Sequence, residues 1–324
     1  MNTFRFIVIL SMLTPFACFF LALVGNPVLL PSDVLSFADT QDSRIYWQLR
    51  FPRTLLAIIA GGGLALSGAV FQAIFRNPLA TPYTLGVASG ASFGATLHIT
   101  LFGYSSVFIL GLNTISWAAF GGAVISMLIV YSLAQLRNAP PEQMLLAGVV
   151  ANFFFSSLIV FMQYIADSSG VLRIVRWTMG GLDFPGYEEL IQLTPFVLII
   201  SALTYVFARE LNVLATGVER AYSIGISVER CHRFLFFATS LLVAAIVSIC
   251  GPIGFVGLMV PHICRLLTGP DHSVLLIASF IVGGLFLAIC DTAARTLFSV
   301  GELPVGILTG MLGAPFFLWL LFKR

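Results

Sequence analysis

Charge is what this sequence has least of. Lysine, arginine, aspartate and glutamate make up 9% of its 324 residues, whereas soluble domains carry about 25%. Hydrophobic residues make up 59%, and the mean hydropathy is +1.01. Apolar runs of about 20 residues cross a bilayer as helices, because a helix satisfies its backbone hydrogen bonds within the segment. The composition excludes a soluble globular protein and predicts an all-α polytopic membrane protein.

Motifs for catalysis and metal binding are also missing. The sequence has no HExxH zinc motif and no GxxxxGK[ST] phosphate-binding loop. Its five cysteines stand singly, and its four histidines are isolated from one another and from paired carboxylates. The scattered basic residues form no patch for nucleic acid. We therefore expect no enzymatic activity, no catalytic or metal-binding residue and no bound cofactor. Any ATP and Mg²⁺ would be used by a separate chain.

The N-terminal residues 1–23 resemble a signal peptide, because Arg5 precedes an apolar run. This run is longer than the apolar core of most signal peptides, lacks a clear cleavage site and precedes further apolar runs. We interpret it as the first transmembrane helix, with Arg5 in the cytoplasm.

Long stretches without charged residues indicate the remaining spans. They are 6–32, 54–75, 77–136, 143–166, 190–208, 234–264, 272–290 and 303–322. The interval 77–136 is long enough for two spans, and the glycines and proline after residue 250 leave only a short helix from 258 to about 268. This pattern predicts about ten transmembrane helices in one transmembrane domain, 1–324, with both termini on the same side. Basic residues are more frequent in the loops assigned to the cytoplasm, as the positive-inside rule requires.

A charged island, residues 209–233, separates two apolar runs and contains four arginines and three glutamates. The positive-inside rule places it in the cytoplasm. We predict two short helices, 217–224 and 227–233, broken at Gly225. Their spacing predicts a small apolar face that would seat in a partner's groove, formed by Val218, Ala221, Tyr222 and Gly225. The alternative is a solvated loop with incidental helicity.

Asp291 is the only acid in a late apolar run, and Arg295 follows one helical turn later. Carboxylates inside a membrane are costly and often mark ion coupling. An ion pair between Asp291 and Arg295 near the outer face is the simpler interpretation. A secondary transporter would need several such groups near the midplane, which this sequence lacks.

Four motifs together resemble the permease subunits of the iron-chelate and vitamin B12 uptake ABC importers, the FecCD type. They are RFPR at 50–53 leading into GGGLALSGAVFQAIFRNPLATPYTLGVASGASFG, the island 209–233, GPIGFVGLMVPHICRLLTGPDH at 251–272 and DTAARTLFSVGELPVGILTGMLGAPFFLWLL at 291–321. The resemblance runs from about residue 48 to the C-terminus. It implies a type II ABC importer fold, like that of the vitamin B12 permease, with ten transmembrane helices. It also implies a second permease chain, two cytoplasmic ATPase subunits and a periplasmic substrate-binding protein.

The resemblance also implies roles for particular residues. ATPase coupling would fall to the cytoplasmic hairpin 209–233, at Gly217, Arg220, Ala221, Gly225 and Arg230. Docking of the binding protein would fall to Arg50, Arg53 and Arg295, whose planar guanidinium groups suit carboxylates. A competing interpretation is that Arg50 and Arg53 anchor a helix end at the headgroups. A cytoplasmic gate would lie at Asn77, Leu79, Pro140 and Pro141, although many relatives carry small hydroxyl residues where this chain has the two prolines.

The expected function is alternating-access import, in a bacterial inner membrane, of an iron(III)-siderophore complex from periplasm to cytoplasm. Vitamin B12, haem or an oxyanion such as molybdate remain alternatives, because no residue discriminates among them. The cargo path should be mostly apolar, since the apolar runs contain few charges. An ion-coupled secondary transporter is a weaker hypothesis, and a structural or sensory membrane protein is the weakest.

Overall fold

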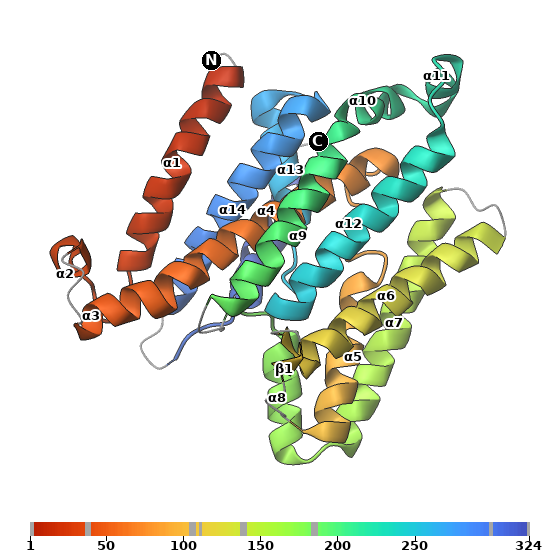
Figure 1. The fold of residues 1–324 in the computed structure, drawn as a ribbon. Helices are drawn as coiled ribbons and strands as arrows, with labels where there is room; N and C mark the ends of the chain where they lie inside the picture. The colour runs from red at the N-terminus through yellow and green to blue at the C-terminus, as the bar shows by residue number, and fades with distance from the viewer. Residues whose placement is uncertain are drawn as a thin grey trace.

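The computed structural model describes residues 3–35, 40–103, 108–109, 112–136, 141–182, 187–297 and 301–322, and these are mostly helical (Figure 1). The elements are α1 (Thr3–Leu23), α2 (Pro31–Leu35), α3 (Gln41–Arg44), the π-helical turn η1 (Ile45–Arg50), α4 (Phe51–Ile74), α5 (Val87–Phe102), β1 (Phe108–Ile109), β2 (Leu112–Asn113), α6 (Thr114–Leu136), α7 (Pro141–Ile165), α8 (Ser168–Thr178), α9 (Glu188–Val206), α10 (Ala208–Thr216), α11 (Val218–Ser223), α12 (Val228–Cys250), α13 (Val256–Thr268), α14 (His272–Thr296) and α15 (Val305–Phe322). The two strands form a small antiparallel hairpin that pairs Phe108 with Asn113 and Ile109 with Leu112.

The membrane-spanning elements agree with the spans expected from the charge-free intervals. Within the described residues, six helices are long and apolar enough to cross a bilayer, and four further apolar segments of 10–17 residues lie in α1, α5, α13 and α15. The expected short helix is α13, which begins after the helix-breaking residues 251–254. The chain is therefore a multi-pass membrane protein, and the expectation of about ten helices is confirmed.

Helix α4 is the centre of the bundle, because 89% of its most apolar stretch of 18 residues is buried within the protein. It packs against α12, α13 and α14, and its contact with α14 is the most extensive between two helices in the described chain. Glycines permit the close approach. A Cβ added at Gly61 would lie 2.3 Å from the carbonyl oxygen of Gly283, and one at Gly68 only 1.8 Å from that of Gly257. Small residues let transmembrane backbones touch in this way.

The helices divide into two groups that meet along a seam. The first helix group consists of α1, α4, α9, α12, α13 and α14, and the second consists of α5, α6, α7 and α8. In the second group a Cβ at Gly94 would lie 2.2 Å from the carbonyl oxygen of Ala118, so α5 and α6 are also in backbone contact. Helix α12 crosses the seam by packing on α5 and α6.

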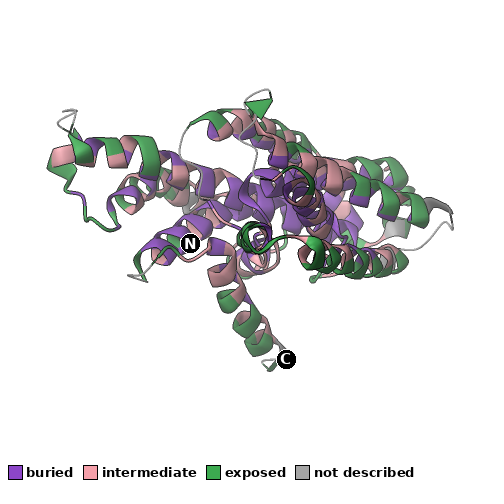
Figure 2. Ribbon diagram, turned by 90° about the horizontal axis from the view of Figure 1, so that it is seen from below, coloured by how far each residue is buried: buried purple, intermediate pink, exposed green. Residues whose placement is uncertain are grey.

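The two ends of the bundle differ in what they carry (Figure 1). One end, here the hairpin end, carries α10 and α11 with the beginning of α1. The other, here the α8 end, carries α8 and the β1–β2 hairpin. Helix α15 projects from the body, and its terminal turns are largely exposed (Figure 2). Exposed leucine and phenylalanine side chains along α7, α9 and α15 suit the lipid phase or a partner helix.

Candidate functional site

A cavity of about 260 Å³ lies on the seam between the two helix groups. The first group contributes Leu64 of α4, Val243 of α12 and the segment that begins α13. The second group contributes Asn152 of α7 and the loop before α5. The complete lining, here called the seam cavity, is Leu64, Thr81, Pro82, Tyr83, Thr84, Asn152, Val243, Gly254, Phe255, Gly257 and Leu258.

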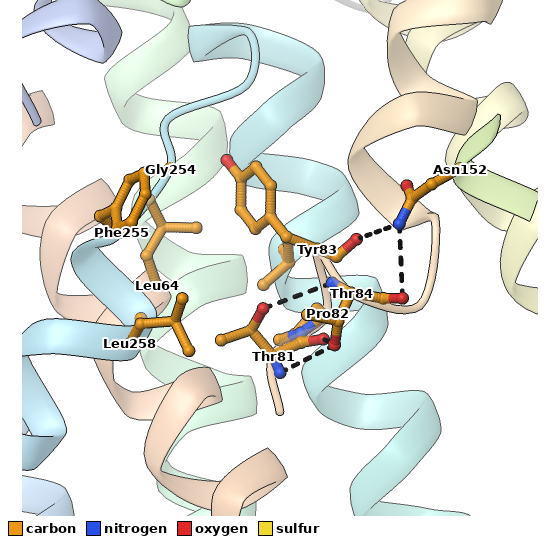
Figure 3. Close-up of a pocket in the computed structure, with 11 residues that line it drawn as sticks. Leu64, Thr81, Pro82, Tyr83, Thr84, Asn152, Gly254, Phe255 and Leu258 are labelled. Atoms are coloured by element: carbon orange, nitrogen blue, oxygen red, sulfur yellow. Dashed lines mark hydrogen bonds between the residues drawn. The ribbon is translucent and has the colours of Figure 1, made fainter. Parts of the chain in front are cut away.

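Hydrogen bonds hold the loop that forms one wall of the seam cavity (Figure 3). The Asn152 amide Nδ2 donates to the carbonyl oxygens of Tyr83 at 3.1 Å and Thr84 at 3.4 Å, so α7 fixes this loop. Its Oδ1 accepts a 2.8 Å bond from the Ser89 hydroxyl of α5. Within the loop, the amide of Thr81 donates to Thr84 Oγ1 at 3.1 Å. The wall is therefore ordered before any ligand arrives.

Tyr83 connects the two sides of the seam. The backbone N–H of Ile253, just before α13, donates to the Tyr83 hydroxyl oxygen at 2.5 Å. In Figure 3 the ring of Tyr83 stands between Phe255 and Asn152. This bond joins the first helix group to the second.

The chemistry of the seam cavity suits an uncharged surface. Hydroxyl, amide and apolar groups line it, and none of the described lining residues carries a formal charge. Such a wall can contact a bulky ligand without holding a bare ion, which would need charged or dense oxygen ligands. The expectation of a mostly apolar path is consistent with this lining. The sequence did not locate the cavity, although the adjoining TPYT and GPIGF segments were within its motifs.

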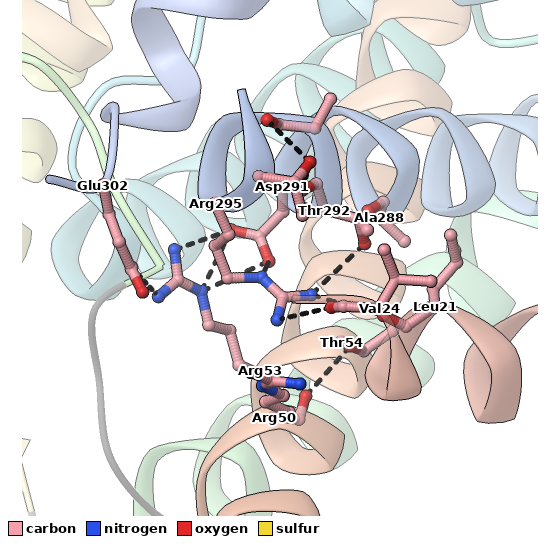
Figure 4. Close-up of polar contacts among 12 residues, drawn as sticks. Leu21, Val24, Arg50, Arg53, Thr54, Ala288, Asp291, Thr292, Arg295 and Glu302 are labelled. Carbon is pink, nitrogen blue, oxygen red and sulfur yellow. Dashed lines mark hydrogen bonds and ion pairs between the residues drawn. The ribbon is translucent and has the colours of Figure 1, made fainter. Parts of the chain in front are cut away.

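A second group of polar residues lies where α4 begins and α14 ends (Figure 4). This arginine cluster is defined here as Arg50, Arg53, Asp291, Arg295 and Glu302. Arg53 donates to both carboxylate oxygens of Asp291, with Nη2 to Oδ1 at 2.9 Å and Nε to Oδ2 at 3.2 Å. Arg295 Nε also donates to Asp291 Oδ2 at 3.2 Å. The expected ion pair between Asp291 and Arg295 is confirmed, and Arg53 is an additional partner.

The arginine cluster joins three segments that are distant in sequence. Arg50 donates to the carbonyl oxygens of Leu23 at 3.3 Å, the last residue of α1, and of Pro27 at 2.8 Å, in the segment after α1. Arg53 Nη1 donates to Glu302 Oε2 at 2.5 Å, in the segment before α15. A cavity of about 470 Å³ adjoins the cluster and is lined by all three arginines and Glu302.

Burial changes the interpretation of the three docking candidates. Arg50 is 7% exposed and Arg295 is 8% exposed. Arg53 is bound by two carboxylates, and only the Glu302 side chain, at 54%, is freely accessible. The guanidinium groups therefore serve first to join α1, α4 and α14. Docking of a binding protein by Arg50, Arg53 and Arg295 stays a prediction, and headgroup anchoring does not explain their internal bonds.

The hairpin end contains a short helix, α11, where the first of the two short helices was predicted, but its boundaries differ from the predicted 217–224. Helix α10 already begins at Ala208, and α11 covers Val218–Ser223. The chain then turns at Gly225, whose φ of +86° favours glycine. The second predicted helix, 227–233, is wrong as a separate element, because it forms the first turns of the 23-residue helix α12.

The predicted apolar face of this hairpin does not point outward toward a partner, contrary to what was expected. Ala221 is 0% exposed and packs into the core of its own chain, so it cannot seat in a partner's groove. Arg220, Tyr222, Ile224 and Arg230 are exposed instead. Helical spacing placed Ala221 and Tyr222 on one face, but α11 is too short for that face to be uniform. The predicted coupling roles stay predictions for all five residues: Gly217, Arg220, Ala221, Gly225 and Arg230. Ala221 could contribute to coupling only by packing within its own chain.

The predicted gate is only partly visible. Asn77 Oδ1 accepts a 2.9 Å hydrogen bond from the amide of Leu79, which forms a tight turn after α4 and leaves Leu79 exposed. Helix α7 begins at Pro141, whose side chain is outside the described residues, as is the whole of Pro140. A gate formed by these four residues stays a prediction.

Metal-binding chemistry is not evident in the parts of the chain that the structure describes. No group of three or more histidine, cysteine, aspartate or glutamate residues lies close enough there to hold an ion. All five cysteines are buried and free.

Comparison with known proteins gives consistent matches over most of the chain. The sequence profile described as "FecCD transport family" matches residues 12–323. A "Cobalamin import system permease protein BtuC" from Halobacterium salinarum is 42% identical, over 85% of this chain and 73% of that protein. A "Hemin transport system permease protein HmuU" from Yersinia pestis is 36% identical, over 86% of this chain and 84% of its own length.

One solved structure has the same fold. It is described as "An inward-facing conformation of a putative metal-chelate type ABC transporter". The TM-score is 0.86 at 31% sequence identity, and the match covers 100% of both chains.

Proposed function

Because this chain belongs to the FecCD transport family and is a permease of the ABC importer class, we propose that it moves a bulky metal chelate into the cytoplasm across a bacterial inner membrane. ATP hydrolysis in a separate partner chain, which also holds Mg²⁺, drives the movement. The observation that supports this cargo class is the uncharged seam cavity, whose hydroxyl, amide and apolar groups suit an enclosed metal complex. An iron(III)-siderophore complex is the first candidate.

Vitamin B12 is the second candidate cargo. The relative named for cobalamin import is 42% identical to this chain, and the one named for hemin is 36% identical. A corrinoid also presents amide and apolar groups around an enclosed metal, so it fits the same uncharged lining.

The size of the seam cavity supports a second permease chain. Pockets for drug-sized ligands measure about 300–1,000 Å³, and the seam cavity measures about 260 Å³. A whole chelate therefore does not fit within one chain, whereas two chains that face each other would enclose a larger path. The projecting helix α15 and the exposed apolar face of α7 offer surfaces for such a partner.

The hairpin end is the proposed cytoplasmic side, where two ATPase subunits would bind. Arg220, Tyr222 and Ile224 are exposed there and present a cation beside apolar groups. Both termini would lie on this side. The α8 end would then face the periplasm, where a binding protein would dock near the arginine cluster. Its three arginines and two acids leave one net positive charge, which would attract an acidic side chain.

An ion-coupled transporter is less consistent with these contacts. Asp291 was its candidate residue, and both of its carboxylate oxygens are bound by arginine. Because guanidinium donors already occupy both oxygens, this carboxylate is paired within the chain and presents no free oxygen to a transported ion.

Cargo uptake tests the proposal directly. Cells that depend on this chain, its partner ATPase and its binding protein should accumulate radiolabelled iron(III)-siderophore, and unlabelled siderophore should compete. Accumulation of labelled vitamin B12 with no iron uptake would replace the first candidate by the second. Uptake of neither, or of a free metal ion in preference to chelates, would contradict the proposed cargo class. Cells lacking only the ATPase provide the control.

A further inference from the structure

Helix α10 is joined to the beginning of α14 by one side chain, Asn212. Its Nδ2 donates to Asp271 Oδ1 at 2.7 Å. Its Oδ1 accepts from the backbone N–H of His272 at 2.8 Å and lies 2.8 Å from His272 Nδ1. An amide oxygen can only accept, so Nδ1 of His272 carries a proton. A single amide thus makes three polar contacts with two consecutive residues.

The two residues that are hydrogen-bonded to Asn212 fix the start of α14. Asp271 is the N-cap residue, and its Oδ1 also accepts from the Ser273 amide at 2.9 Å. The hydrogen bond from Asn212 lowers the pKa of Asp271 below its ordinary value, so the cap is held as a carboxylate. His272 is buried beside it. The contact is therefore built into the helix terminus.

Apolar contacts alone would hold α10 less specifically. Leu211 and Leu214 of α10 are fully buried, but hydrophobic contact is non-directional and permits neighbouring helices to slide. The bonds of Asn212 have fixed donors and acceptors, so they set the register between α10 and α14. A displacement of α10 then has to move α14 or break these bonds.

Helix α14 can carry such a displacement through the first helix group. It is a continuous helix of 25 residues from His272 to Thr296. It makes backbone contact with α4 through Gly61 and Gly283, and near its far end Asp291 is bound to Arg53 of α4. Both α4 and the segment after it border the seam cavity.

We propose that Asn212 is a positioning residue that transmits movement of the α10–α11 hairpin to α14 and thus to the seam. This inference rests on the proposed function, because it supposes that an ATPase moves the hairpin. Asn212 touches no cargo and no nucleotide. Its part is to prevent α10 from moving without α14.

The test is the ratio of ATP hydrolysed to cargo accumulated, measured in proteoliposomes with the complete importer. Asn212→Leu keeps a similar volume and removes every polar contact. It should leave hydrolysis near the wild-type rate and raise the ratio about tenfold, within the range of allosteric couplings. Thr216→Ala is the matched control on α10, because the Thr216 hydroxyl is exposed and donates to the Val213 carbonyl oxygen of the same helix. Its ratio should match the wild type.

A second variant covers the case in which Asn212→Leu does not assemble. Asn212→Asp keeps an acceptor for His272 but loses the donor to Asp271 and places two carboxylates together, so its ratio should also rise. A wild-type ratio in an assembled Asn212→Leu or Asn212→Asp importer would overturn the inference. Absence of ATP-dependent accumulation in the wild type would instead overturn the proposed function, so the two failures are distinguishable.

Discussion

Replacing Asp291 by alanine is expected to destabilise the protein by about 3–5 kcal/mol, because it removes one partner of a buried ion pair. Asp291 is fully buried and is bound by Arg53 and Arg295. Without it, two desolvated guanidinium groups face each other near the ends of α4 and α14. The repulsion and the lost hydrogen bonds act together. We expect a much lower melting temperature of the purified protein in detergent and a small yield of folded protein.

Glu302→Gln is the matched control for this prediction. Glu302 also binds Arg53, but its side chain is 54% exposed, and exposed ion pairs contribute about 0–1 kcal/mol. Its melting temperature should stay close to that of the wild type. If Asp291→Ala melts like Glu302→Gln, the arginine cluster does not hold α4 and α14 together in the way described above.

The second large effect is expected at Gly68. An alanine Cβ there would lie 1.8 Å from the carbonyl oxygen of Gly257. Neither atom belongs to a side chain that can rotate away, so α4 and α13 must separate. Overpacking of this kind lowers the free energy of unfolding by about 1–3 kcal/mol. Because the clash at Gly68 is with backbone, we expect a loss at or above the upper end of this range. Because the seam cavity lies beside this contact, transport should fall together with the melting temperature.

Gly121→Ala tests whether the Gly68 effect arises from close approach. Gly121 lies within α6, and a Cβ there would meet no atom within 4 Å. Alanine favours helix over glycine by about 1 kcal/mol, so this variant should be unchanged or slightly more stable. If Gly68→Ala and Gly121→Ala lose the same stability, the close approach of α4 to Gly257 is not the cause of the Gly68→Ala effect.

Much of the fold follows from the sequence because lipid imposes a simple rule. Charge-free runs must become helices, so their number and order predicted about ten apolar helices. The glycines and proline at 251–254 interrupt the helix, so the short helix α13 after them could be predicted from the local sequence. Similarly, Asp291 and Arg295 are neighbours on one helix, so their pairing could be inferred from spacing alone.

Contacts between distant segments could not be inferred in this way. Arg53 and Asp291 are 238 residues apart, so the sequence showed an arginine and an acid but not their bond. The burial of Arg50 and Arg295 likewise has no local signature in the sequence. Ala221 illustrates the same limit, because periodicity defines the faces of a helix but not which face the rest of the chain covers. The seam cavity arises from five separate segments and has no local signature.

The most direct test of the central claim is ATP-dependent accumulation by the purified importer in sealed vesicles. The vesicles contain this chain with its partner ATPase, and the binding protein and a labelled metal chelate are supplied on the side of the α8 end. The account predicts accumulation with ATP at the opposite side and none with a hydrolysis-deficient ATPase. Accumulation driven by an ion gradient in vesicles without the ATPase would contradict it.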